Sequence, residues 1–181
     1  MPPVLIIVHG LPATGKTTIA QWLAADVGLP LASKDLFKET LFDTLGWRDR
    51  AWSQQLGRAS IALLFQFMEV QLRAGCSCIV ECNFSPVLAT PEFVALRERY
   101  TYEPIEIVCR CDGPVLWEWF KRRAGSGERH AGHVDHQSYD DLAPMLLRGT
   151  TAPLGIGGHV LDVDTTDWNR VDYAALVATI R

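Results

Sequence analysis

The sequence lacks the features of a secreted or membrane-bound protein. No apolar run is long enough to span a bilayer, and the apolar run at residues 4–8 begins without a basic leader. The five cysteines are an odd number, which does not suggest the disulfide framework of a small secreted domain. We therefore expect a cytoplasmic protein whose thiols are reduced.

Positive charge is also scarce. Lysine and arginine total 17 against 21 aspartates and glutamates, which gives a formal net charge of −4. This balance disfavours a broad basic face for duplex nucleic acid, although it leaves room for a local basic patch. The chain also lacks internal repeats and low-complexity tracts. With 181 residues, of which 48% are hydrophobic, it is expected to fold as one domain around a substantial core.

No pattern of metal ligands stands out either. Two Cys-x-Cys pairs, at residues 76–78 and 109–111, have strand spacing, so both thiols of a pair face one side, as small core residues often do. Histidines recur at every third position over residues 130–136, but no second pair of ligands lies nearby in the sequence. We therefore favour buried thiols over a zinc site, and contacts to substrate or phosphate over a histidine-bound metal.

What the sequence does contain is a phosphate loop at residues 10–18 (GLPATGKTT), which fits the pattern G-x-x-x-x-G-K-[ST]. The glycines let the backbone approach phosphate oxygens closely, and the helix that follows adds the positive end of its dipole. Lys16 is expected to bind the β- and γ-phosphates, and Thr17 to offer its hydroxyl to Mg²⁺. The predicted contacts to ATP are Gly10, Ala13, Thr14, Gly15, Lys16, Thr17 and Thr18.

Hydrophobic periodicity predicts strands that alternate with helices, and therefore an α/β fold with a parallel sheet and helices on both faces. The uninterrupted apolar run near the N-terminus predicts a central strand that is covered on both sides. The helix at residues 53–74 is apolar nearly all round at its centre, which predicts that it is buried. We expect strands at residues 3–9, 31–33, 76–82, 103–111 and 159–164, and helices at residues 16–27, 36–45, 53–74, 91–100, 115–123, 138–147 and 171–180.

Two carboxylates follow predicted strands at the edge where ligands of such sheets bind. Asp35 can accept the proton of an attacking hydroxyl or orient that hydroxyl, and the alternative is an N-cap of a helix that begins at Leu36. Glu81 can hold Mg²⁺ through water, contact the acceptor or act as the base in place of Asp35. Asn83 is expected to hydrogen-bond the substrate or to shape the turn before Pro86.

The segment at residues 36–58 is expected to bind the acceptor. Residues 47–52 interleave aromatic and cationic side chains, a composition that suits a flat or anionic substrate. Trp47 and Arg58 are the candidate contacts. The alternatives are a tryptophan that is folded into the core and an arginine that is solvated.

Residues 121–137 are predicted to form a mobile lid. A cationic helix end carries Arg122 and Arg123, two glycines follow, and Arg129 lies beyond them. Glycines allow movement, and the arginines would neutralise charge on the transferred phosphoryl group. We assign Arg122 and Arg129 to catalysis and Arg123 to the nucleotide. The alternative is a solvated charge cluster that interacts with the dipole of the helix C-terminus.

Five stretches together resemble the small P-loop kinases of the adenylate-kinase-like superfamily: residues 10–18, 33–35 (SKD), 81–84 (ECNF), 121–123 (KRR) and 128–130 (ERH). Within it, the chain is similar to the ATP-binding kinases related to chloramphenicol phosphotransferase and to the kinase domain of phage polynucleotide kinase.

This resemblance implies a three-layer P-loop NTPase fold with a five-stranded parallel sheet, a mobile arginine lid and phosphoryl transfer to a hydroxyl. It also puts Asp35 in the position of the usual base. Lys38 stands where polynucleotide kinase has an arginine that binds substrate phosphate. Arginine and lysine differ in geometry, so this replacement weakens the match to a polynucleotide substrate.

These inferences favour a phosphotransferase that moves the γ-phosphoryl group of ATP, with Mg²⁺, to a hydroxyl of a small molecule. One alternative is a 5′-hydroxyl nucleic-acid kinase, which the acidic net charge disfavours. Another is a nucleotide-binding switch or ATPase that uses hydrolysis to change partners. The predicted catalytic residues are Lys16, Asp35, Arg122 and Arg129, and the predicted acceptor-side residues are Lys38, Trp47, Arg58, Glu81 and Asn83.

Overall fold

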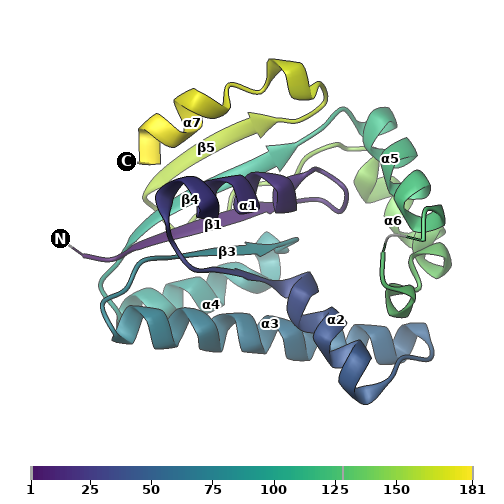
Figure 1. Cartoon of the computed structure of the whole chain (residues 1–181), viewed down its shortest axis with the longest axis horizontal. Coiled ribbons are helices and arrows are strands. Elements are labelled where there is room, and N and C mark those ends of the chain that lie inside the picture. The colour runs from purple at the N-terminus through teal and green to yellow at the C-terminus, as the bar shows by residue number, and fades with distance from the viewer. Residues whose placement is uncertain (1, 128, 181) are drawn as a thin grey trace.

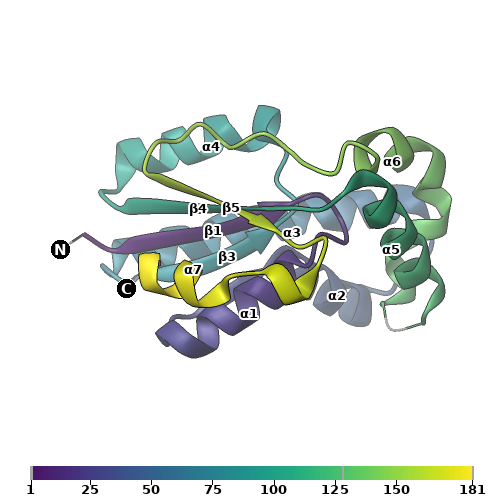
Figure 2. The same ribbon diagram turned by 90° about the horizontal axis from the view of Figure 1, so that it is seen from above.

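The structure, a computed structural model, describes residues 2–127 and 129–180; Glu128 of the predicted lid lies outside them. Its centre is a five-stranded sheet in the order β2-β3-β1-β4-β5, and every adjoining pair is parallel. Helices cover both faces of the sheet (Figures 1 and 2), so the predicted three-layer α/β fold is confirmed. The strands are β1 (Val4–Gly10), β2 (Leu31–Ser33), β3 (Cys78–Cys82), β4 (Glu103–Arg110) and β5 (His159–Asp164).

Strand β1 lies in the middle of the sheet because both of its faces are apolar. Leu5 and Ile7 pack into the core on one side, and Ile6 and Val8 pack into the core on the other. All four side chains are fully buried, and burying a side chain of this size contributes about 1.5–3 kcal/mol. The prediction of a central parallel strand is therefore confirmed.

The helices form two layers and one group at an end of the sheet. Helices α1 (Lys16–Val27) and α7 (Tyr173–Ile180) lie on one face, and α3 (Arg50–Arg73) and α4 (Pro86–Arg99) lie on the other (Figure 2). The group lies beyond the carboxyl ends of the strands, where the ligand sites of parallel sheets are found (Figure 1). It comprises α2 (Lys34–Leu45), α5 (Gly113–Gly125), α6 (Tyr139–Leu146) and the short 3-10 turns η1 (Ala131–His133) and η2 (Asp135–Ser138).

Helix α3 packs against the sheet along one face only, although its centre is apolar nearly all round. Leu64 and Met68 are fully buried against the sheet, whereas Leu63 and Val70 are 45% and 51% exposed. The helix belongs to an outer layer and covers the sheet with a single stripe. No helix in the described ranges, α3 included, is long and apolar enough to cross a membrane.

Helices α2, α3, α4 and α5 begin two to five residues earlier than the sequence predicted. Helix α4 begins at Pro86 rather than at Pro91, because proline suits the first helical position, where its missing N–H has no partner to lose. Helix α3 begins at Arg50, because the Asp49 carboxylate caps it by accepting a hydrogen bond from the Trp52 N–H at 2.8 Å.

Helix α2 begins at Lys34, with Ser33 in the N-cap position. The alternative interpretation of Asp35 as the N-cap is therefore wrong, because Asp35 lies inside the first turn. A carboxylate in a first turn still interacts favourably with the helix dipole. The consequence is that the Asp35 side chain is free to face the carboxyl edge of the sheet.

The five cysteines are free thiols, and all but Cys76 are buried. Strand β3 begins at Cys78, so Cys76 lies outside the strand, and the first expected pair does not share a strand face. Burial raises the pKa of Cys82 and of Cys109 to about 12. These thiols are therefore protonated and act as small core residues.

Candidate nucleotide and acceptor site

The phosphate loop leaves β1 and curls into the start of α1. A Cβ on Gly10 would lie 2.3 Å from the carbonyl oxygen of Cys109 on the neighbouring strand β4. Gly15, the N-cap of α1, has a φ of +74°, and a Cβ there would lie 2.3 Å from the ring of Trp168. Ala13 also has a positive φ, +68°, a strained value of the kind that gathers at ligand sites. The tight curvature of this loop therefore depends on both glycines.

Thr14 fixes this curvature from the inside. It is fully buried, and its Oγ1 donates a hydrogen bond to the carbonyl oxygen of Leu11 at 2.9 Å. The Thr165 hydroxyl, just beyond β5, is shared between the carbonyl oxygens of Thr14, at 2.8 Å, and Arg110, at 2.9 Å. The side chain of Thr14, which was predicted to contact the nucleotide, therefore stabilises the loop from inside.

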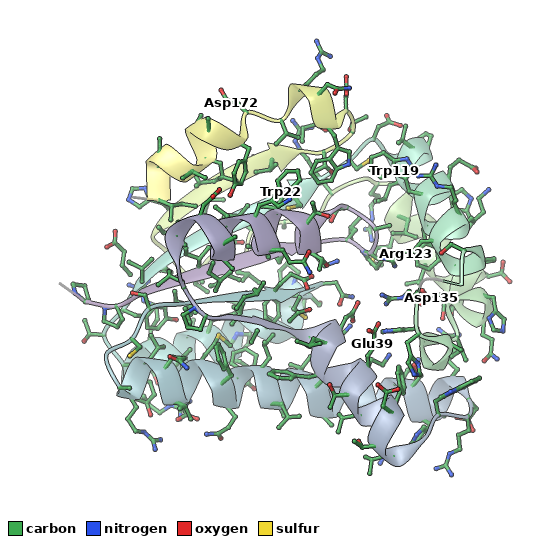
Figure 3. All side chains as sticks on the ribbon, viewed as in Figure 1. Trp22, Glu39, Trp119, Arg123, Asp135 and Asp172 are labelled. Carbon is green, nitrogen blue, oxygen red and sulfur yellow. The ribbon has the colours of Figure 1, made fainter. Side chains whose placement is uncertain are left out.

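A cavity of about 690 Å³ opens between the loop and helix α5. We call it the nucleotide-side cavity. It brings the start of α1 together with Arg122 and Arg123, which were predicted to belong to the lid. Figure 3 shows Trp119 and Arg123 on α5, beside the loop. The residues that line it are Ala13, Gly15, Lys16, Thr17, Thr18, Trp119, Arg122, Arg123, Ser126 and Trp168.

Two tryptophans of this cavity were missed by the sequence analysis. Trp119 precedes Arg122 by three residues and Arg123 by four, so all three share one face of α5, and this spacing is a usable signal. Trp168 begins the turn η3 (Trp168–Arg170) after β5 and contacts Trp22 edge-on, with 5.6 Å between ring centres. No local pattern marks Trp168, because only the fold brings it beside the loop.

Lys16 and Glu81 meet behind the loop. Lys16 Nζ lies 3.6 Å from Oε1 of Glu81, and Oε2 of Glu81 accepts a hydrogen bond from Ser33 Oγ at 2.6 Å. Both Lys16 and Glu81 are nearly buried, at 6% and 2% exposure. The parallel pairing of β1 with β3 places Val8 opposite Glu81, and this register brings the carboxylate beside the loop.

Asp35 lies between two cations. Its Oδ1 is 2.7 Å from Lys34 Nζ, and its Oδ2 is 3.0 Å from Nη1 of Arg129 in the predicted lid. Burial by itself would raise the pKa of Asp35, but Lys34 and Arg129 outweigh it and hold that pKa well below the ordinary value. Asp35 is therefore ionised at neutral pH. Lys34 Nζ also donates to Asn83 Oδ1 at 3.1 Å, which fixes the predicted contact Asn83 beside it.

Arg129 organises the loop that follows α5. Its Nε lies 2.7 Å from Asp135 Oδ2, and its Nη2 lies 3.0 Å from Nδ1 of His133. Burial, and then repulsion from Arg129, lower the pKa of His133 to about 2, so its ring is neutral. Because a guanidinium can only donate, Nδ1 accepts from Arg129, and Nε2–H donates to Glu39 Oε1 at 2.8 Å. Figure 3 shows Asp135 and Glu39 on either side of the space that Arg123 faces.

A second, smaller cavity of about 250 Å³ lies between the loop, α2 and the predicted lid, and we call it the acceptor-side cavity. Lys16 and Arg123 line both cavities, so the two spaces share a wall at these residues. Its predicted residues are Lys16, Lys38, Asp35, Asn83, Arg123 and Arg129. The other residues that line it are Pro12, Lys34, Arg50, Ser53, Gln54, Phe120, His133, Asp135, Ser138 and Leu142. His133 is one of the histidines predicted to contact substrate or phosphate, whereas the sequence did not mark Ser53, Gln54, Phe120, Ser138 or Leu142 as contacts.

Three predicted acceptor-side residues, Trp47, Arg58 and Glu81, line neither cavity, and Glu81 lies behind the loop as described above. Arg58 is exposed on α3. Trp47 is 49% exposed, and its Cβ lies 2.8 Å from the place that a Cβ on Gly132 would occupy, so it contacts the lid. His130 stacks on Phe42 of α2, with 5.0 Å between ring centres. Aromatic rings of residues 42 and 47 therefore support the lid instead of lining the acceptor-side cavity.

The fold and the site define the class of protein: a parallel α/β protein of the P-loop kinase type, with a phosphate loop at the carboxyl end of its central strand. Residues 5–142 match the model of the AAA domain family. This is well over half of the chain, and the protein therefore belongs to that family. No curated protein sequence matches the chain at a significant level.

Several solved structures are similar to the chain. A candidate kinase from Chloroflexus aurantiacus J-10-fl is 44% identical with a TM-score of 0.94, over 100% of this chain and 98% of that one. A sugar kinase from Janibacter sp. HTCC2649 is 19% identical with a TM-score of 0.55, over 99% and 92% of the two chains. A gluconokinase from Sinorhizobium meliloti 1021 is 16% identical with a TM-score of 0.55, over 99% and 93%. The last two likenesses show the shared fold alone.

Proposed function

We propose that the protein is an ATP-dependent phosphotransferase that moves the γ-phosphoryl group of ATP to a hydroxyl of a small molecule. The observation that carries the proposal is the shared wall of the two cavities. Lys16 and Arg123 line both of them, so a phosphoryl group bound there would face a nucleotide on one side and an acceptor on the other. This is the arrangement that in-line transfer needs.

On the nucleotide side, Lys16 and the N–H groups of the loop would hold the phosphates. The rings of Trp119 and Trp168 are flat apolar surfaces that suit stacking with the base. Arg122, Arg123 and Arg129 would neutralise the charge that spreads over the phosphoryl oxygens during transfer. We propose residues 121–137 as the lid that carries all three of these arginines, and residues 36–58 as the segment that forms the acceptor wall.

Mg²⁺ fits the residues on the phosphate side. Thr17 offers an exposed hydroxyl, and Ser33 and Glu81 offer further oxygen ligands beside Lys16. In residues 2–127 and 129–180, no three His, Cys, Asp or Glu side chains gather around a possible ion, so phosphate oxygens and water would supply the other ligands. When bound, Mg²⁺ neutralises charge on the β- and γ-phosphates.

We propose that Asp35, rather than Glu81, binds the acceptor hydroxyl and accepts its proton. Asp35 lines the acceptor-side cavity, whereas the oxygens of Glu81 face Lys16 and Ser33. Because its pKa is held low, Asp35 is a weak base, which suits orienting the hydroxyl and accepting its proton late in the transfer. The new P–O bond forms to the acceptor, the bond to the ADP oxygen breaks, and the hydroxyl proton passes to Asp35.

We also place the chain, as part of this proposal, beside the kinases related to chloramphenicol phosphotransferase and to the phage polynucleotide kinase domain. The SKD, ECNF and KRR stretches support that placement. The small volume of the acceptor-side cavity and the acidic net charge favour a small acceptor over a nucleic-acid end.

A transfer screen tests this function. The protein would be incubated with γ-labelled ATP, Mg²⁺ and pools of hydroxylated metabolites, and the label would be followed into new products, with Lys16→Ala as the blank. We expect a labelled small molecule that the Lys16→Ala variant does not form. Hydrolysis that a protein partner stimulates, without any labelled small molecule, would instead support a nucleotide switch.

A further inference from the structure

Lys38 is the one cation of the acceptor-side cavity that has no carboxylate partner in the part of the chain that the structure describes. Six cationic side chains line this cavity. Lys16, Lys34, Arg50, Arg123 and Arg129 each lie within 4.0 Å of a carboxylate oxygen. Lys38 does not, although it is only 8% exposed. An enclosed ammonium without a counter-charge is unfavourable unless a ligand supplies that charge.

The groups in direct contact with Lys38 are neutral, and the charges that act on it from further away are those of Lys34, Asp35, Arg129 and Asp135. Its Nζ donates a hydrogen bond to Ser53 Oγ at 2.9 Å and lies 5.3 Å from the ring centre of Phe42. A Cβ on Gly57 of α3 would lie 3.8 Å from the same nitrogen. Burial, and then repulsion from Lys34, lower the pKa of Lys38 to about 8, as expected for a cation that lacks a partner. Lys38 therefore keeps donor capacity and positive charge for a ligand in the cavity.

Lys38 lies close to Asp35, the residue that is proposed to bind the acceptor hydroxyl. Asp35 and Lys38 are three residues apart on α2, and side chains at this spacing lie on the same helix face. Both line a cavity of about 250 Å³, which is below the range of roughly 300–1,000 Å³ of sites for drug-sized ligands. One small molecule can therefore contact both side chains at once.

We propose that the acceptor is a small hydroxy acid whose carboxylate binds Lys38 and Ser53 while its hydroxyl faces Asp35. The proposal rests on the phosphotransferase function above, and it names the substrate class of that site. The reacting hydroxyl would lie roughly one helical turn, about 5 Å, from the carboxylate. A single unpaired cation matches the single charge of a carboxylate better than the nearly double charge of a phosphate ester.

Matched probes test the substrate class. Label transfer from ATP would be compared among aldonic acids, the alditols of the same carbon skeleton and the corresponding sugar phosphates. We expect transfer to at least one acid, with a kcat/KM about tenfold or more above that of its alditol, because a charge-assisted contact is lost in the neutral probe. Equal use of the alditol would overturn the proposal, and preferred use of the sugar phosphate would overturn its assignment to carboxylates.

Variants of Lys38 test the site itself. Lys38→Met keeps the apolar length of the side chain, and it should raise the KM of the preferred acid about tenfold to a hundredfold with little change in kcat. Lys38→Arg restores the charge and should restore most of the affinity. An unchanged KM in Lys38→Met would overturn the proposal. Arg73→Met, at the exposed end of α3, is the control for loss of a cation elsewhere.

A binding measurement without ATP separates this proposal from the proposed function. Thermal denaturation would be followed with and without each aldonic acid, for the wild type and for Lys38→Met. We expect the acid to raise the melting temperature of the wild type only. If it does so while no probe is ever phosphorylated, the anion site stands and the phosphotransferase function fails. If transfer occurs and no acid stabilises the wild type through Lys38, the function stands and the acid proposal fails.

Discussion

Arg129 Nη1 lies 3.0 Å from Asp35 Oδ2, which joins the predicted lid directly to the residue that is proposed to orient the acceptor. The second oxygen of Asp35 faces Lys34 at 2.7 Å, so both oxygens lie next to a cation. After Lys34, Arg129 is the charge that most lowers the pKa of Asp35. The position of the predicted lid and the electrostatics of Asp35 are therefore coupled through this pair.

Replacing Arg129 should move the acid limb of the pH profile. In the wild type, Arg129 helps to hold the pKa of Asp35 well below its ordinary value, so Asp35 stays ionised to low pH. In Arg129→Met, the pKa of Asp35 should rise toward its ordinary value, and activity should fall off at a higher pH than in the wild type. Profiles of kcat/KM against pH measure this shift. Arg129→Lys keeps the charge and should keep the limb at low pH; an unmoved limb in Arg129→Met would contradict the coupling.

Lys16 and Asp35 should separate binding from chemistry. Lys16→Ala removes the ammonium proposed to hold the β- and γ-phosphates, so phosphoryl transfer should be lost. Asp35→Asn keeps the shape of the side chain but not its charge, and turnover should fall about 10²–10⁴-fold while ATP binding is retained. Calorimetric titration with ATP and a transfer assay give the two quantities. Normal turnover in Asp35→Asn would show that Asp35 is not the base and would favour Glu81 in that role.

The fold could be predicted because its signals are local. An apolar run over residues 4–8 specifies a central strand by itself, and the nine residues of the phosphate loop specify the strand-to-helix turn that follows. The exposed face of α3 could not be predicted, because the covering of Leu63 and Val70 depends on what lies beyond that helix. Composition records that such residues are apolar, but it does not record which layer they occupy.

The site could be predicted only where the topology alone determines proximity. Asp35 follows β2 and Glu81 lies near the end of β3, so a parallel sheet must bring both to one edge. Trp168 and Asp135 were missed because they reach the site through the docking of loops. No periodic pattern in the sequence predicts contacts of this kind.

The two tryptophans of the nucleotide-side cavity, Trp119 and Trp168, should contribute to ATP binding. Stacking of a base on an aromatic side chain is worth about 1–3 kcal/mol, so Trp119→Leu or Trp168→Leu should each weaken ATP binding by roughly 5- to 150-fold. Titration calorimetry measures the loss directly. Trp117→Leu makes the same change on α5 at a residue outside this cavity, and it should leave ATP affinity unchanged. Equal losses in Trp117→Leu and Trp119→Leu would point to damage to the helix instead of to the base site.

Gly132 should be required for docking of the lid. A Cβ at this position would lie 2.7 Å from Cγ of Phe42 and 2.8 Å from Cβ of Trp47, so Gly132→Ala must push the lid away from α2. A displacement of about 1 Å can lower the rate about 100-fold, and a lid held open also admits water. We therefore expect slower transfer and relatively faster ATP hydrolysis, both followed by release of labelled products. Transfer as fast in Gly132→Ala as in the wild type would show that close docking is dispensable.

The pH dependence of acid binding gives the sharpest test of Lys38. Its pKa of about 8 means that its charge is present below that pH and is lost as pH rises through it, whereas the carboxylate of a hydroxy acid stays ionised throughout. The affinity of the wild type for an aldonic acid should therefore be constant from about pH 6 to 7 and fall above about pH 8. In Lys38→Arg the guanidinium stays charged, so acid binding should persist and this fall should disappear. Because arginine does not titrate in this range, an identical fall in the wild type and in Lys38→Arg would assign the titration to another group and separate Lys38 from the acid.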